Sequence, residues 1–114
     1  MNSQIKQLWL DALRSGEYKQ KRRKLRDTNS FCCLGVLCDL YAKEHGKEWD
    51  YDKGENYYYF EEADTGLAKS VMNWAGLTEE YPEVIMNGQI YPTDLATIND
   101  DYGFNFNQIA ELIS

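Results

Sequence analysis

The sequence is poor in the residues that mark several common classes of protein. Its 114 residues include only two Pro and eight Gly, too few for a low-complexity or collagen-like chain. No apolar run approaches the ~20 residues that a membrane-spanning helix needs. Segment 1–16 lacks the cationic start and the small-residue cleavage site of a signal peptide. We therefore expect a cytoplasmic protein that has no membrane partner.

Residues suited to catalysis or metal binding are also scarce. Cys32, Cys33 and Cys38 contain no C-x-x-C pair, and a helix over residues 34–45 would hold Cys38 and His45 roughly 10 Å apart. We interpret the three cysteines as small buried hydrophobic residues and the single His45 as a surface residue at a helix end. No P-loop and no dinucleotide-binding glycine motif is present. The sequence thus indicates no catalytic residues, no metal and no cofactor.

Charge is distributed unevenly along the chain. The net charge is −7, but residues 1–30 carry +5 and residues 31–114 carry −12. Six of the eight positions from Lys19 to Arg26 are cationic. The acidic body argues against general nucleic-acid binding, which needs a broad basic surface. The basic segment suits a smaller anion, such as a nucleotide phosphate.

The hydrophobic pattern predicts an α+β fold for one compact domain, residues 1–114, with about five helices and short antiparallel hairpins. Apolar residues at helical spacing between polar caps and glycines mark each helix. The first has Ile5, Leu8, Trp9, Ala12 and Leu13 facing inward, a cap at Asn2 or Ser3, and Gly16 after its end. The others are Leu34–His45 with Gly46 after it, a helix from a cap at Asp64 or Thr65 to Gly76, one from Thr93 to about Asp100, and one after Asn105.

Three hairpins are expected between these helices. Aromatic strands at Trp49–Tyr51 and Tyr57–Phe60 flank a polar turn. Val84–Met86 and Gln89–Tyr91 flank Asn87-Gly88, a strong hairpin signal. We interpret residues 17–33 as a third hairpin, which carries the cationic arm. Tyr18, Gln20, Arg22 and Lys24 would share one face of its first strand, and Asp27-Thr28-Asn29-Ser30 has the composition of a turn.

Three segments resemble a family of small proteins that bacteriophages and prophages encode. They are WLDALRSGEYKQ (Trp9–Gln20), LR (Leu25–Arg26) and FCCLGVLCDL (Phe31–Leu40). WAGL, LATIND and FNQIA in the C-terminal part extend the similarity over most of the chain. The resemblance implies a phage accessory protein and supplies no mechanism. Family members often have glycines where Lys21–Lys24 stand here, so a glycine-dependent phosphate cradle does not follow.

Six residues in or beside the basic segment are the candidate ligand-binding residues. Arginine gives bidentate contacts to phosphate, tyrosine offers a stacking face, and glutamine can read a base or ribose edge. They are Arg14, Tyr18, Gln20, Arg22, Arg23 and Arg26. The hypothesis is a phage-encoded, non-enzymatic binding protein that counters host defence by sequestering a small nucleotide immune signal. A homo-oligomer formed through the aromatic strand Tyr57–Phe60 fits this role.

Two other functions stay open at the level of sequence. The sixteen Asp and Glu residues after residue 30 could imitate nucleic-acid phosphates, so that the protein inhibits a host defence protein or nuclease. A small enzyme acting on a phosphorylated substrate is the second alternative. No nucleophile–base pair supports it.

Overall fold

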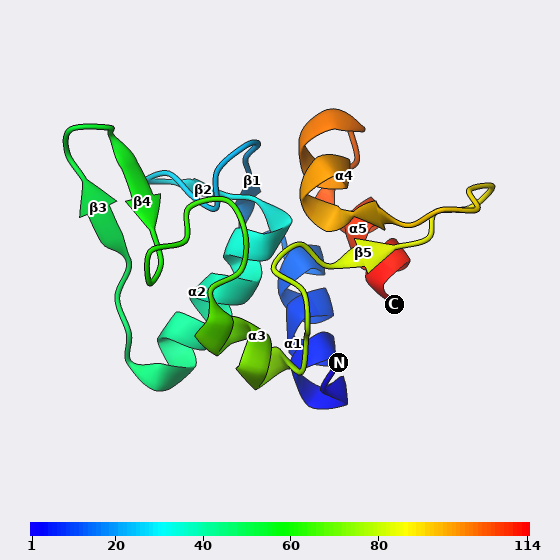
Figure 1. The fold of residues 1–114 in the computed structure, drawn as a ribbon, viewed down its shortest axis with the longest axis horizontal. Helices are drawn as coiled ribbons and strands as arrows, with labels where there is room; N and C mark the ends of the chain where they lie inside the picture. The colour runs from blue at the N-terminus through cyan, green and yellow to red at the C-terminus, as the bar shows by residue number, and fades with distance from the viewer.

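The structure, a computed structural model, describes residues 1–114 as five helices and six short strands (Figure 1). The helices are α1 (Ser3–Arg14), α2 (Cys33–His45), α3 (Lys69–Ala75), α4 (Leu95–Asp101) and α5 (Phe106–Ile113). The strands are β1 (Lys19–Gln20), β2 (Ser30–Phe31), β3 (Asp50–Asp52), β4 (Tyr57–Tyr59), β5 (Glu83–Val84) and β6 (Thr93–Asp94). This confirms the α+β class. The radius of gyration is 13.3 Å, in agreement with the value of about 13 Å expected for one compact domain of this length.

None of the five helices combines the length and the apolar character needed to cross a lipid bilayer.

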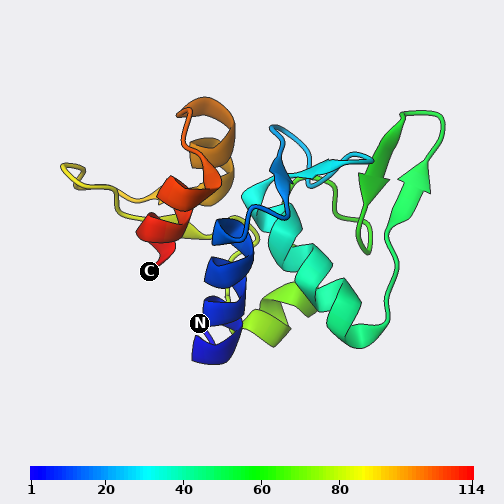
Figure 2. The ribbon, with the colours of Figure 1, turned by 180° about the vertical axis from the view of Figure 1, so that it is seen from behind.

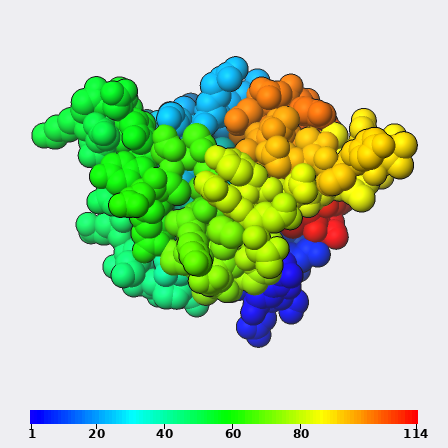
Figure 3. Space-filling model, viewed as in Figure 1, coloured from blue at the N-terminus to red at the C-terminus, as the bar shows by residue number.

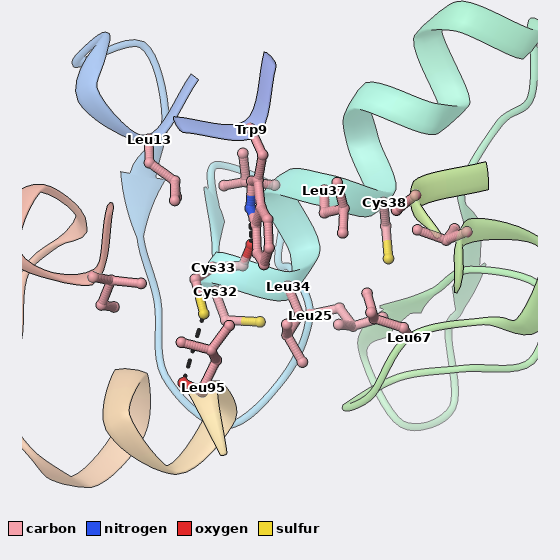
Figure 4. Close-up of a cluster of buried hydrophobic side chains, with 14 of the residues drawn as sticks. Trp9, Leu13, Leu25, Cys32, Cys33, Leu34, Leu37, Cys38, Leu67 and Leu95 are labelled. Carbon is pink, nitrogen blue, oxygen red and sulfur yellow. Dashed lines mark hydrogen bonds between the residues drawn. The ribbon is translucent and has the colours of Figure 1, made fainter. Parts of the chain in front are cut away.

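Helix α2 lies at the centre and contacts α1, α3 and α4 (Figures 1 and 2). Its residues from Cys33 to Asp39 are all buried, which is typical of a helix that is apolar on more than one side. Trp9 and Leu95 converge on its first turn (Figure 4), where Trp9 Nε1 donates to the Cys33 carbonyl at 3.0 Å. Gly46 follows α2 with φ 64°, which confirms its predicted role in ending the helix.

Helix α1 packs against both α5 and α2. Asn2 caps its start by accepting the amides of Gln4 and Ile5, as predicted. The prediction that Leu8 faces inward is wrong, because Leu8 is exposed and Leu10 is buried. Because α2, α3 and α5 all contact α1, its buried stripe is centred on Trp9, Leu10 and Leu13.

Segment 17–33 is not the predicted antiparallel hairpin. Strands β1 and β2 pair in parallel, with Lys19 opposite Ser30. The chain reverses twice between them, once near Arg23 (φ 79°) and once at the turn that brings Arg26 antiparallel to Phe31. Two reversals restore the original direction, so the pairing is parallel. The predicted common face for Tyr18, Gln20, Arg22 and Lys24 is therefore absent.

The predicted aromatic hairpin is confirmed, and the hairpin predicted around Asn87-Gly88 has a different register. Strands β3 and β4 pair antiparallel around the polar turn. Strand β5 pairs with β6, which lies beyond the predicted Gln89–Tyr91. Ile90 and Tyr91 stay outside the sheet because Pro92, which has no N–H to donate, separates them from the pairing that starts at Thr93.

Two helix caps also differ from the prediction. Helix α3 begins after Ala68 without a side-chain cap, so the predicted caps Asp64 and Thr65 lie before the helix, and the Asp64 carboxylate accepts from Lys24 Nζ. Helix α4 is capped by Asp94, one residue after the expected Thr93. The cap of α5 is as predicted, with Asn105 and the third helical residue forming a capping box.

Candidate functional site

The cationic side chains of the basic loop, residues 21–26, extend from a backbone that is tied to the body. The Lys21 amide donates to the Phe31 carbonyl at 2.8 Å, and the Leu25 amide donates to the Asp64 carbonyl at 2.7 Å. The Leu25 side chain is fully buried. Buried backbone bonds and one apolar anchor therefore fix the position of the loop.

A pocket of about 230 Å³ lies between this loop and the β3–β4 turn, and we call it the basic-loop pocket. It is lined by Lys21, Lys24, Arg26, Asp27, Glu55, Asn56 and Tyr57. Lys24 Nζ lies 2.7 Å from an Asp64 carboxylate oxygen and 4.6 Å from the centroid of the Tyr57 ring. The hydrogen bond to Asp64 raises the pKa of Lys24. The pocket lining therefore combines three cations and one aromatic ring with two carboxylates, which leaves a small excess of positive charge for an anion.

Arg26 is held between three aromatic rings. Its guanidinium carbon lies 4.4 Å from the ring centroid of Tyr58, 4.6 Å from that of Phe31 and 5.2 Å from that of Trp49. Arg26 Nε also donates to the Asp27 carbonyl at 3.0 Å. Cation–π contacts on this scale fix the guanidinium without neutralising its charge. Arg26 thus joins β2 to the β3–β4 hairpin and keeps a positive charge at the pocket.

The turn that closes the loop depends on Asp27. Its Oδ1 accepts from the amides of Asn29 and Ser30 and from the Ser30 hydroxyl, at 2.7–2.9 Å. Burial raises the pKa of Asp27, but these hydrogen bonds and the Lys21 charge outweigh it, so the pKa lies below its ordinary value. The turn predicted from the sequence is therefore formed around an ionised carboxylate.

A second pocket, of about 260 Å³, lies between α1, β1 and the start of α5. It is lined by Leu13, Arg14, Gly16, Tyr18, Gln20, Asn105, Phe106 and Asn107. Four of its polar side chains already have partners within the protein: Arg14, Tyr18, Gln20 and Asn105. An Arg14 nitrogen lies 3.5 Å from a Glu111 carboxylate oxygen, and Gln20 Nε2 donates to the Asn99 side chain and to the Phe104 carbonyl.

The six predicted ligand-binding residues therefore do not share one pocket. Arg14, Tyr18 and Gln20 line the second pocket, whereas Arg26 lines the basic-loop pocket. Arg22 and Arg23 are exposed on the loop and take part in no ion pair. The parallel β1–β2 pairing separates residues that a hairpin would have placed along one strand.

Asp39 was not expected from the sequence to hold this region together. Its buried carboxylate accepts from the Tyr18 hydroxyl at 2.7 Å and from Trp49 Nε1 at 3.0 Å, and Lys43 Nζ lies 3.3 Å away. Burial and then the Asp39 hydrogen bond raise the pKa of Tyr18 to about 12. The sequence could have indicated this role, because Asp39 is the only acid in the apolar run Phe31–Leu40 and a buried carboxylate requires hydrogen-bond partners.

Asn99 is a second polar residue that the sequence reasoning missed. It is fully buried, and its Oδ1 accepts from Gln20 Nε2 and from the Cys33 amide. Its Nδ2 donates to the Lys21 carbonyl at 2.7 Å and to an Asp100 carboxylate oxygen. One side chain thus connects α4 to β1, to the basic loop and to the start of α2.

The cysteines are buried and unpaired, which confirms the prediction that they act as small hydrophobic residues. Burial raises the pKa of Cys32 to about 11 and raises the pKa of Cys38 further still. His45 is exposed, as predicted, and stacks on Tyr41 with ring centroids 4.1 Å apart. No three His, Cys, Asp or Glu side chains are placed to hold a metal ion.

The fold and this region together define a small α+β protein with a cationic pocket beside a buried polar network. The chain belongs to the family described as a domain of unknown function, DUF8296, whose sequence model matches residues 1–114. No curated protein and no solved structure matches the chain.

Proposed function

We propose that the protein is a non-enzymatic binding protein for a small nucleotide-type anion, and that the basic-loop pocket receives its phosphate. The observation that carries this proposal is that Lys21, Lys24 and Arg26 line one pocket together with the ring of Tyr57. Ammonium and guanidinium groups suit phosphate, and a tyrosine ring suits a base. The pocket volume of about 230 Å³ suits a small ligand or part of a larger one.

The state of each cation decides how much charge is free for a ligand. Lys24 is paired with Asp64, and Lys21 Nζ lies 3.9 Å from the Asp27 carboxylate, a weak contact at the surface. Arg22 and Arg23, which lie between them in sequence, are exposed and unpaired. These two arginines do not line the pocket, but they add unpaired positive charge to the loop beside it, which would attract an anionic ligand.

Binding fits the side chains better than turnover does. Burial raises the pKa of Cys32, Cys33 and Cys38, and a protonated thiol is a poor nucleophile. His45 lies stacked on Tyr41 and bonded to its carbonyl. Together with the resemblance to bacteriophage proteins, this supports sequestration of a nucleotide signal of host defence inside the bacterial cell.

The test is thermal unfolding with a panel of cyclic and ADP-ribose nucleotides. A ligand at about 100 times its Kd stabilises a protein by about 2.7 kcal/mol. We expect one nucleotide to raise Tm, to be recovered intact after heat denaturation, and to lose its effect in the variant with Arg22→Glu and Arg23→Glu. Lys47→Glu, an exposed lysine outside the pocket, is the matched control.

Three outcomes contradict the proposal. They are no Tm shift with any nucleotide, recovery of a chemically changed nucleotide, and an equal loss of binding in Lys47→Glu. The second outcome indicates an enzyme. The third indicates nonspecific attraction to net charge.

A further inference from the structure

The C-terminal segment 70–114 differs in charge from the rest of the chain. Its charged residues are all acidic: Glu79, Glu80, Glu83, Asp94, Asp100, Asp101 and Glu111. No Lys, Arg or His follows Lys69, so this segment alone carries the whole net charge of −7. The 12 Lys and Arg residues before it are balanced by as many Asp and Glu residues. The surface of this segment attracts basic partners and repels anionic ones.

One projection within this acidic segment is apolar and uncharged. The finger, residues 85–91, runs from β5 toward β6 and extends from one end of the molecule (Figures 1 and 3). Ile85 is 64% exposed, Ile90 84% and Tyr91 77%, and none of them packs against the core. Large apolar side chains gathered at one exposed place mark interaction surfaces.

The base of the finger is anchored, so the projection has a defined position. Met86 is buried, and the Gln89 amide donates to its carbonyl at 3.0 Å. Glu83 and Asp94 lie opposite each other in the β5–β6 pair, directly below the finger. The Glu83 side chain is exposed, and the Asp94 carboxylate caps α4 by accepting from Thr97, so one free and one bonded carboxylate lie beside the apolar tip.

We propose that the finger and these carboxylates form a docking surface for a basic protein, in which Lys or Arg side chains surround an apolar depression. Ile90 and Tyr91 would enter the depression, and the cations would contact the surrounding acids. This interaction goes beyond nucleotide binding and uses a different part of the chain, since no residue of the finger lines the basic-loop pocket.

The negative charge of segment 70–114 favours a basic protein over a second copy of the chain, a nucleic acid or an anionic membrane. A second copy bound through the same face would bring together two segments that each carry −7. Nucleic acids and anionic membranes would be repelled for the same reason. A basic protein surface gains from both the apolar contact and the charge.

The first experiment uses an amphipathic helical peptide of leucine and lysine as a defined basic, apolar test partner. A second peptide with every leucine replaced by serine keeps the charge and lacks the apolar face. We expect fluorescence anisotropy to show binding of the first peptide only, weaker at high salt. The variant with Ile90→Ser and Tyr91→Ser should bind at least about tenfold more weakly, because both apolar side chains that enter the depression are lost.

Tyr51→Ser is the matched control, because Tyr51 is an exposed aromatic residue (44%) on β3, away from the finger. The finger variant should keep its Tm and its nucleotide response, which separates this proposal from the nucleotide-binding one. Equal binding of both peptides, or unchanged binding by the finger variant, overturns the proposal. So does sedimentation that shows a dimer lost on mutation of the finger, since a second copy would then be the occupant.

Discussion

The carbonyl oxygen of Leu25 lies so close to helix α2 that a Cβ atom added to Gly35 would be 1.8 Å from it. The same carbonyl accepts the Cys32 amide at 3.0 Å. No side chain fits between these backbones, so the basic loop can reach its position only because residue 35 is glycine.

Gly35→Ala is expected to destabilise the protein by at least about 1–3 kcal/mol, the usual cost of overpacking a core. The new methyl group must displace the Leu25 backbone, and with it the loop. Urea unfolding measures the effect. Gly54→Ala is the control, because its Cβ would meet only an Asp52 side-chain oxygen at 3.3 Å. Equal stability of the two variants would contradict the close approach.

Arg26→Lys is expected to cost about 1 kcal/mol of unfolding free energy, although it keeps the charge. A lysine ammonium cannot lie flat against Phe31, Trp49 and Tyr58 while donating to the Asp27 carbonyl. Urea unfolding is the measurement. The control is Arg14→Lys, which alters one exposed ion pair and should change stability by less than about 0.5 kcal/mol. If Arg26→Lys costs no more than Arg14→Lys, the aromatic contacts do not stabilise the fold.

Alkaline pH should weaken the protein through Tyr18. Its pKa is 10.0 ordinarily and about 12 in the folded protein, so the folded state holds the proton more tightly than the unfolded state does. This stabilisation is complete below pH 10 and is lost as the pH rises through 12. Unfolding free energies measured across this range should fall more steeply for the wild type than for Tyr18→Phe. Parallel curves would show that the hydroxyl of Tyr18 is not bonded to Asp39.

Asn99→Leu should destabilise the protein by more than about 2 kcal/mol, because it leaves the Cys33 amide and the Lys21 carbonyl without their partner. Asn73→Ala, at an exposed position on α3, serves as the control and should be nearly neutral. Hydrogen exchange gives a second readout, since the amides of the basic loop should lose protection in Asn99→Leu. Unchanged exchange would mean that Asn99 does not hold the loop.

Features set by neighbouring residues were predictable from the sequence. The caps at Asn2 and Asn105 and the helix end at Gly46 depend only on side chains within a few positions. The turn at Asp27 belongs to the same group, because the carboxylate bonds residues two and three positions away.

Features set by distant residues were not predictable. The parallel pairing of β1 and β2 follows from how the loop docks at Asp64 and Asn99, far along the chain. The separation of Arg14 from Arg26 into two pockets follows from that pairing. The hydrogen bonds of Asp39 and Asn99 join residues far apart in sequence. The sequence can therefore indicate that such a polar residue is buried, but it cannot indicate which residues it bonds.

Helix α1 has its most extensive contact with α5, the helix farthest from it in sequence. Every other element lies between these two helices in sequence. Nearly the whole chain must therefore lose conformational entropy before the α1–α5 contact forms. We expect folding to be slow for a protein this small and rich in helix. If the chain is cut between α2 and α4, neither fragment should fold, so the basic loop and the finger should both lose their structure.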